Sequence, residues 1–222
     1  MKLVLHNYWR SSASYRVRIG LALKQQAYEY VAVDIVHGAQ FAEAYRSMNP
    51  MGQVPTLEIL EDDGARRVLS QSLPILEYLD ERWPDPPILP RDPYLRAKAR
   101  ALAEIVNSGI QPMQNLTVTR QIKALGGDDA AWIRTFMGEG LTAFARLVED
   151  TAGEFCVGDA PTIADCCLVP QLAAARRYAV KLDAAFSRML AIEARCRALP
   201  AFTDAEPDQQ PDAIVPGNRM KS

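Results

Sequence analysis

The chain has 222 residues, of which 49% are hydrophobic and 23% charged, and its formal net charge is −2. This balance is typical of a globular protein and excludes a globally basic surface of the kind that binds nucleic acid. No stretch approaches the roughly 20 apolar residues of a membrane span, and the N-terminus lacks a signal peptide. We therefore expect a cytoplasmic protein that binds neither nucleic acid nor membranes.

In chain order, the first 83 residues alternate between strand and helix patterns. Runs of β-forming residues predict strands at 2–5, 28–35, 56–60 and 68–70. Helical spacing predicts a helix from Ser12 onward and two more at 41–48 and 72–83. Ser72 is the predicted N-cap of the last helix. The order β-α-β-α-β-β-α indicates an α/β domain.

A proline-rich stretch separates this domain from a second one. Residues 84–93 contain five prolines, so we predict a stiff linker at 84–92. Every segment after Pro93 is helical by period and propensity, which predicts an all-helical domain at 93–203. The "TIAD" stretch, Thr162 to Asp165, has the pattern of a capping box that starts one of these helices. A polar tail, 204–222, is expected to be ordered only by docking.

The histidines and cysteines indicate whether the chain has a metal site or redox-active thiols. The two histidines are too few and too scattered for a metal site, so no metal is expected. Four cysteines are present without a Cys-X-X-Cys motif, which predicts reduced, buried thiols and disfavours thiol–disulfide exchange. They are Cys156, Cys166, Cys167 and Cys196.

Hydroxyl groups crowd the first strand-to-helix turn, in "RSSASYR". Ser11, Ser12 and Ser14 offer more hydroxyls than the capping of one helix requires. A hydroxyl beside a helix N-terminus can lower the pKa of a thiol from its usual value of about 8.5. Ala13 fills the position between the serines, so a thiolate held here must come from a cofactor.

Two further stretches offer polar groups to a peptide-like ligand. In "GQVPT", a cis Pro55 would leave the backbone N–H and C=O of Val54 free to pair as an added strand does; an ordinary trans proline is the alternative. In "SQS", Gln71 and Ser72 stand at a helix N-terminus, which favours a carboxylate.

Taken together, these stretches resemble the zeta class of the cytosolic glutathione transferases over about residues 3–202. The family has a thioredoxin-like N-terminal domain and an all-α C-terminal domain, which is the fold class that the resemblance implies here. "GIQPMQN" and the Ser-Ser-X-Ser segment are specific to the class, whereas "VPT" and "TIAD" belong to the wider superfamily. The matching segments are "RSSASYRVRI", "NPMGQVPTLEI", "QSLPILEYL", "GIQPMQNLTV" and "TAGEFCVGDAPTIADCCLVPQL".

The resemblance implies site residues, with glutathione as the cofactor. Ser11 is expected to stabilise the thiol with Ser12 beside it, and Val54 to pair with the cysteinyl backbone. Arg177 is expected to hold a substrate carboxylate, and Arg10 joins it because it neighbours Ser11. Tyr8, a thiolate stabiliser in other classes, is the less favoured alternative to Ser11. The full glutathione set is Ser11, Ser12, Ala13, Ser14, Tyr15, Arg16, Gln40, Val54, Gln71, Ser72, Gln111, Asn115, Leu116 and Thr117.

The activity implied is glutathione-dependent cis–trans isomerisation of maleylacetoacetate to fumarylacetoacetate, in tyrosine and phenylalanine catabolism, by a homodimer with a small anionic substrate. One departure bears on this expectation: the family motif reads Ser-Ser-Cys-Ser, and Ala13 removes the covalent chemistry of that cysteine. The alternatives left open are maleylpyruvate isomerisation, glutathione transfer to small α-haloacids, and a glutathione-binding interaction protein without turnover.

Overall fold

The computed structural model describes residues 1–214. Contacts group the chain into two compact units. The first unit is Met1–Pro86 together with the segment that begins at Leu199, and the second is Pro87–Ala198. The first unit thus includes residues that the sequence analysis assigned to the helical domain and to the polar tail. The end of that tail, 215–222, lies outside the described residues.

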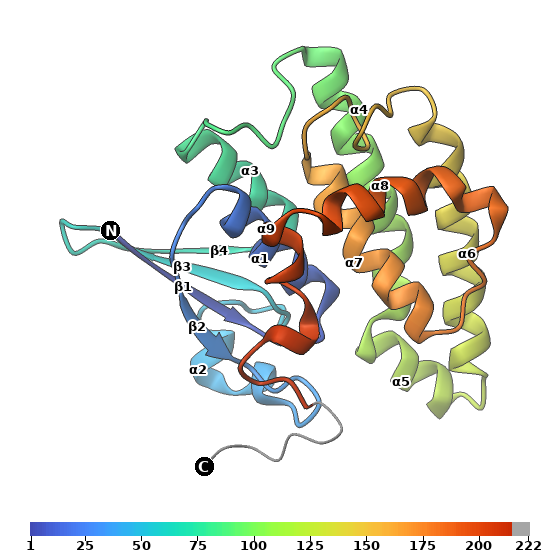
Figure 1. Ribbon diagram of the computed structural model, residues 1–222. Coiled ribbons are helices and arrows are strands. Elements are labelled where there is room, and N and C mark those ends of the chain that lie inside the picture. Colours follow the sequence, from blue (N-terminus) through green and yellow to red (C-terminus); the bar gives the residue numbers. More distant parts are fainter. Residues whose placement is uncertain (215–222) are drawn as a thin grey trace. The chain divides into compact units, whose positions relative to one another are not determined.

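Within the described residues, the first unit contains a four-stranded sheet in the order β2-β1-β3-β4 (Figure 1). β1 runs parallel to β2 and antiparallel to β3, and β3 and β4 form a hairpin. The strands are β1 (Lys2–Asn7), β2 (Glu29–Ala32), β3 (Thr56–Leu60) and β4 (Arg66–Ser70). This arrangement confirms the α/β architecture predicted for the N-terminal part.

Two helices, α1 (Ser12–Leu23) and α3 (Ser72–Arg82), cover the apolar face of the sheet. They pack closely because Gly20 has no side chain: a Cβ there would lie 2.1 Å from Cδ2 of Leu76. Strand alternation places every second residue on this face. The resulting core consists of Leu3, Leu5, Val17, Leu21, Leu57, Ile59, Ile75 and Leu79.

Two local predictions for the first unit are wrong. The N-cap of α3 is Gln71, not Ser72, because the Ser72 hydroxyl accepts a hydrogen bond from Nη1 of Arg16 at 3.1 Å. The helix predicted at 41–48 is instead a 3-10 turn, η1 (Ala39–Phe41), followed by a single helical turn, α2 (Glu43–Arg46).

The chain returns to the first unit after Ala198. It forms the short α9 (Pro200–Thr203), which contacts α1, and then the 3-10 turn η5 (Pro207–Gln209). The hydroxyl of Tyr15 donates to the carbonyl of Phe202 at 2.9 Å, and Nε of Arg18 donates to the carbonyl of Ala205 at 3.0 Å. The described part of the tail is therefore ordered by its hydrogen bonds to α1.

The helices of the second unit agree with the all-α prediction for the C-terminal part, and an isolated β-bridge joins Ala152 and Gly158 in a loop. A π-helical stretch, η2 (Ile105–Ile110), and a 3-10 turn, η3 (Gln111–Gln114), connect its first two helices. The helices are α4 (Pro93–Glu104), α5 (Leu116–Ala124), α6 (Asp129–Val148), α7 (Ile163–Arg177) and α8 (Ser187–Arg197), with the 3-10 turn η4 (Ala184–Phe186) before α8. In residues 1–214, no helix is both long enough and apolar enough to cross a bilayer.

The predicted capping box of α7 is confirmed. The Thr162 hydroxyl accepts from the backbone N–H of Ala164 at 3.3 Å, and Oδ2 of Asp165 accepts from the backbone N–H of Thr162 at 2.7 Å. Asp165 is fully buried, and its other oxygen accepts from the backbone N–H of Cys156 at 2.9 Å. One carboxylate thus joins the start of α7 to the loop before it. All four cysteines are buried and unbridged, as predicted.

Candidate active site

Ser11 lies at the turn between β1 and α1 and caps that helix. Its backbone is extended (φ −68°, ψ 121°), and its Oγ accepts from the backbone N–H of Ser14 at 3.2 Å. Its backbone N–H donates to the carbonyl of Tyr8 at 3.0 Å, which closes the turn. The cap uses the Ser11 oxygen as an acceptor, so the hydroxyl proton can still be donated to a ligand.

The neighbouring residues of the serine motif are placed differently. Ser12 is the first residue of α1 and is half-buried. Ser14 is fully buried, and its Oγ accepts from the backbone N–H of Tyr8 at 3.4 Å. Ala13 and Tyr15 are also buried. Of the motif's side chains, those of Ser11 and Ser12 retain exposed surface that a ligand can reach.

The three arginines that flank the motif divide into one exposed and two buried side chains. Arg10 is exposed, and its guanidinium carbon lies 5.5 Å from the centre of the Trp9 ring. Arg16 is fully buried and donates to Ser72, which joins α1 to the start of α3. Arg18 is buried as well and donates to backbone carbonyls of the turn. Only Arg10 presents its charge at the surface.

The peptide bond between Val54 and Pro55 is cis, which decides between the two alternatives that the sequence left open. The carbonyl of Gln53 accepts two hydrogen bonds, from the Tyr45 hydroxyl at 2.6 Å and from Nδ2 of Asn49 at 2.7 Å. In a planar trans peptide the N–H points opposite to the C=O, so these two donors aim the N–H of Val54 away from themselves. Within residues 1–214, neither backbone group of Val54 has a hydrogen-bond partner.

Gln71 adopts a backbone conformation with φ 71° and ψ 127°, which residues other than glycine rarely adopt. Its exposed side chain lies near this loop, with Nε2 at 3.5 Å from Oε1 of Gln53. Ser72 follows as the first residue of α3. The structure therefore brings the second and third polar stretches together, and the Arg16–Ser72 hydrogen bond joins the third to α1.

Gln40 is nearly buried in η1, and its Nε2 donates to the carbonyl of Ile35 at 3.2 Å. Its Oε1 is buried without a hydrogen-bond partner in the described part of the chain. Buried polar atoms are usually paired, so this oxygen can accept a hydrogen bond from a ligand.

The remaining predicted residues lie in the second unit. Gln111 begins η3, directly after the π-helical stretch, a feature common at functional sites. Asn115 is the N-cap of α5 but makes no side-chain cap hydrogen bond, and 116–117 begin that helix. Arg177 ends α7 and is exposed, with its guanidinium carbon 5.3 Å from the Tyr178 ring centre.

The residue next to Arg177 has a structural partner. Arg176 forms a forked pair with the buried Glu193 of α8, through contacts of 2.6 and 2.5 Å. Arg176 therefore ties α7 to α8.

A cavity of about 390 Å³ in the first unit adds residues that sequence reasoning missed. Nε1 of the buried Trp9 has no hydrogen-bond partner among residues 1–214. Asp212 reaches the cavity from the C-terminal segment, some 200 residues away in sequence, and no local pattern could have indicated it. The lining residues are Tyr8, Trp9, Arg10, Ala32, Asp34, Val36, His37, Asp212 and Ile214.

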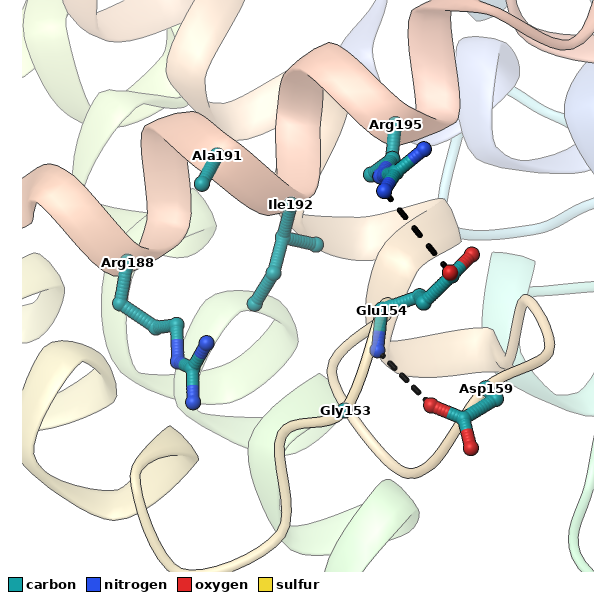
Figure 2. Close-up of a pocket in the computed structure, with 7 residues that line it drawn as sticks. All are labelled: Gly153, Glu154, Asp159, Arg188, Ala191, Ile192 and Arg195. Atoms are coloured by element: carbon teal, nitrogen blue, oxygen red, sulfur yellow. Dashed lines mark hydrogen bonds and ion pairs between the residues drawn. The ribbon is translucent and has the colours of Figure 1, made fainter.

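Figure 2 shows a second cavity, of about 300 Å³, between α8 and the loop that follows α6. Arg195 of α8 pairs with Glu154 of the loop at 3.8 Å, and the backbone N–H of Glu154 donates to Asp159 at 3.0 Å. Arg188 pairs with Glu149 at 3.8 Å. Both arginines in this cavity have carboxylate partners, and we assign it no role in the chemistry.

Comparison with known proteins identifies the family. The family model for the glutathione S-transferase N-terminal domain matches residues 10–82. Maleylacetoacetate isomerase of Rhizobium meliloti is 47% identical over 93% of this chain and 96% of its own. A solved maleylpyruvate isomerase, described as a bacterial zeta-class glutathione S-transferase, is 39% identical, with a TM-score of 0.88, and covers 95% of this chain and 100% of its own. The chain belongs to the zeta class of the glutathione transferases.

A further solved relative of this zeta-class chain bears on its site. The crystal structure of maleylacetoacetate isomerase from Anaeromyxobacter dehalogenans is 51% identical, has a TM-score of 0.88, and covers 96% of this chain and 98% of its own. It is described as having glutathione bound in the active site. The family and the thioredoxin-like fold class inferred from the sequence are confirmed.

Proposed function

We propose that this zeta-class chain is a glutathione-dependent isomerase that converts maleylacetoacetate to fumarylacetoacetate. The observation that carries the proposal is Ser11, whose oxygen caps α1 while its hydroxyl proton remains available at the helix N-terminus. A hydroxyl donor and a helix N-terminus each stabilise a thiolate. The relatives named maleylacetoacetate isomerase support the choice of substrate and its place in tyrosine and phenylalanine catabolism.

Polar groups at three places in the first unit fit the three parts of a tripeptide. Val54 offers a backbone N–H and C=O as an edge strand does, and we place the cysteinyl part of glutathione there. Gln71 and Ser72 at the start of α3 suit the γ-glutamyl carboxylate. Gln40 would receive the glycyl end through its unpartnered Oε1.

The chemistry divides between the cofactor and the chain. When bound, glutathione would supply a thiolate for reversible addition to the conjugated alkene, which permits rotation about the former double bond and returns glutathione unchanged. Ser11 donates to the sulfur and keeps it ionised. Arg177 and Arg10 hold the substrate carboxylates, and the Gln111 region stabilises the charge on the ketone oxygen. The reaction consumes no oxidant or reductant.

A second candidate keeps this site and changes the substrate. The zeta-class maleylpyruvate isomerase is 39% identical over 95% of this chain, so maleylpyruvate is the main competitor as substrate. Both substrates are cis-alkene dicarboxylates with a conjugated ketone, and the same residues would serve either. Glutathione transfer to small α-haloacids would use the thiolate without the elimination that returns it.

Purified protein tests these alternatives directly. We expect glutathione-dependent loss of maleylacetoacetate with a larger kcat/KM than for maleylpyruvate, and little halide release from chlorofluoroacetate. A larger kcat/KM for maleylpyruvate would assign the chain to that reaction, and brisk halide release without isomerisation would make it a haloacid transferase. Glutathione binding without turnover of any of the three would leave only the interaction-protein alternative.

The Tyr45 hydroxyl gives a test of the tripeptide placement at Val54. Tyr45→Phe removes one of the two donors that fix the Gln53 carbonyl, so the N–H of Val54 is less well aimed. We expect glutathione to bind about fivefold more weakly, equivalent to roughly 1 kcal/mol, by isothermal titration calorimetry. Tyr94→Phe, at an exposed tyrosine, is the matched control. Equal affinities for the two variants would argue against the placement.

We also propose that the chain is a homodimer, as the resemblance to its class implied. Sedimentation equilibrium at micromolar concentration is expected to give twice the chain mass of 24.6 kDa. A species of single-chain mass under these conditions would show that the described chain works alone.

A further inference from the structure

The segment that begins at the end of α9 is hydrogen-bonded to the turn that carries Ser11. We call residues 202–212 the C-terminal strap. Gln210 stiffens it internally, because its Nε2 donates to the carbonyls of Asp204 and Glu206 at 2.9 and 2.8 Å. Phe202 and Ala205 are buried, so the strap is packed into the first unit and does not merely lie on its surface.

Arg18 joins the strap to the turn from within α1. Its Nη2 donates to the carbonyl of Trp9 at 2.9 Å, and its Nη1 lies 3.4 Å from the carbonyl of Tyr8. Its Nε donates to the carbonyl of Ala205 in the strap at 3.0 Å. One planar guanidinium therefore fixes two carbonyls of the turn and one carbonyl of the strap.

Asp212 reaches the same turn from the far end of the strap. Its Oδ2 accepts from the backbone N–H of Trp9 at 3.1 Å, and its Oδ1 accepts from the hydroxyl of Tyr30 in β2 at 2.5 Å. Both backbone groups of Trp9, two residues before Ser11, are thus held by side chains. The N–H has its partner in the strap, and the C=O has its partner in α1.

The charges are consistent with this arrangement. Burial lowers the pKa of Arg18, and nearby phenols together with the carboxylate of Asp212 oppose that shift. Burial and the hydrogen bond to Asp212 raise the pKa of Tyr30, so this phenol stays a donor. The Asp212 carboxylate is therefore held between a backbone N–H and a neutral hydroxyl, near a buried cation.

We propose that Asp212 is a positioning residue: through the strap it fixes the Trp9 backbone, and so holds the Ser11 hydroxyl at the mouth of α1. This inference rests on the proposed role of Ser11. The last described turn of the chain, which carries Asp212, then supports the reaction without touching the substrate.

Asp212→Ala tests the proposal with two independent readouts. The first is hydrogen exchange of the Trp9 amide, expected to be about tenfold faster than in the wild type. The second is catalytic: kcat is expected to fall about tenfold while KM for the alkene stays within twofold, and the thiol of bound glutathione, followed by thiolate absorbance, should titrate at higher pH. Asp212→Asn keeps one acceptor oxygen for Trp9 and should recover most of both effects.

Two further variants complete the design. Tyr30→Phe leaves the carboxylate but removes one of its two donors, and should shift both readouts in the same direction by about threefold. Asp208→Ala removes an exposed carboxylate of the same strap and should shift neither. Unchanged Trp9 exchange in Asp212→Ala, or faster exchange with unchanged kcat, would overturn the proposal.

Failure of the proposed function is distinguishable from failure of this inference. If the wild-type protein does not isomerise any alkene, the isomerase assignment falls. The strap proposal then stands if the wild type lowers the pKa of bound glutathione and Asp212→Ala loses that effect together with Trp9 protection. It falls if Asp212→Ala changes neither.

Discussion

Ser11→Ala is expected to lower kcat for glutathione-dependent isomerisation by about a hundredfold or more, in line with the removal of a single hydrogen-bond donor from a reacting anion. The variant leaves the helix N-terminus in place but removes the hydroxyl proton that we assign to the sulfur. The pKa of the bound thiol should rise towards its value in water. Steady-state kinetics at saturating glutathione and thiolate absorbance against pH measure the two effects.

The same substitution also removes a helix cap, so stability must be separated from chemistry. Ser11→Ala should cost about 1 kcal/mol of stability through loss of the cap. Ser11→Asp supplies an equally good cap but no hydroxyl donor, and should recover stability without recovering activity. Ser12→Ala, at the half-buried neighbour, is the comparison for the second predicted serine and should have a smaller effect. Full turnover in Ser11→Ala would remove the basis of the proposed function.

Asp165→Ala is expected to destabilise the chain by about 4 kcal/mol. The fully buried carboxylate accepts hydrogen bonds from the backbone N–H groups of Thr162 and Cys156, at 2.7 and 2.9 Å, and from the Thr162 hydroxyl at 2.9 Å. Without it, two buried N–H groups lose their acceptor, each at a cost of about 1–3 kcal/mol. Urea unfolding followed by circular dichroism measures the loss.

Asp128→Ala provides the matched control for this prediction. Asp128 also caps a helix, accepting from the N–H groups of Ala130 and Ala131 at 3.0 and 2.9 Å, but it is exposed to water. Water can replace an exposed cap, so the loss should be clearly smaller than for Asp165→Ala. Similar losses for the two variants would show that burial of Asp165 adds nothing beyond ordinary capping.

Local sequence signals predicted the structure well where the interacting residues are close in sequence. The period of the apolar residues predicted the four strands and the helices α1 and α3 of the first unit, and "TIAD" predicted the box between Thr162 and Asp165 correctly. Pro55 raised a cis bond as one of two alternatives, and the structure has that bond. Each of these signals is contained within a few residues, so tertiary packing did not have to be known.

The wrong N-cap and the missed contacts involve partners that are distant in sequence. Ser72 is a good N-cap by residue type, but Arg16, 56 residues earlier, uses its hydroxyl. Arg16 and Arg18 are buried and bonded within the first unit, which their charge alone does not indicate. Asp212 meets Trp9 across 203 residues. Contacts of this kind leave no periodic pattern from which to infer them.

The burial of every thiol has a consequence for an enzyme that handles electrophilic alkenes. Burial raises the pKa of Cys156 and of Cys196, and all four cysteines lie within the second unit without access to solvent. With Ala13 where relatives of this class carry a cysteine, the motif around Ser11 presents no sulfur of its own. Such a catalyst resists self-alkylation at sulfur, because every thiol of the chain is buried away from an activated olefin.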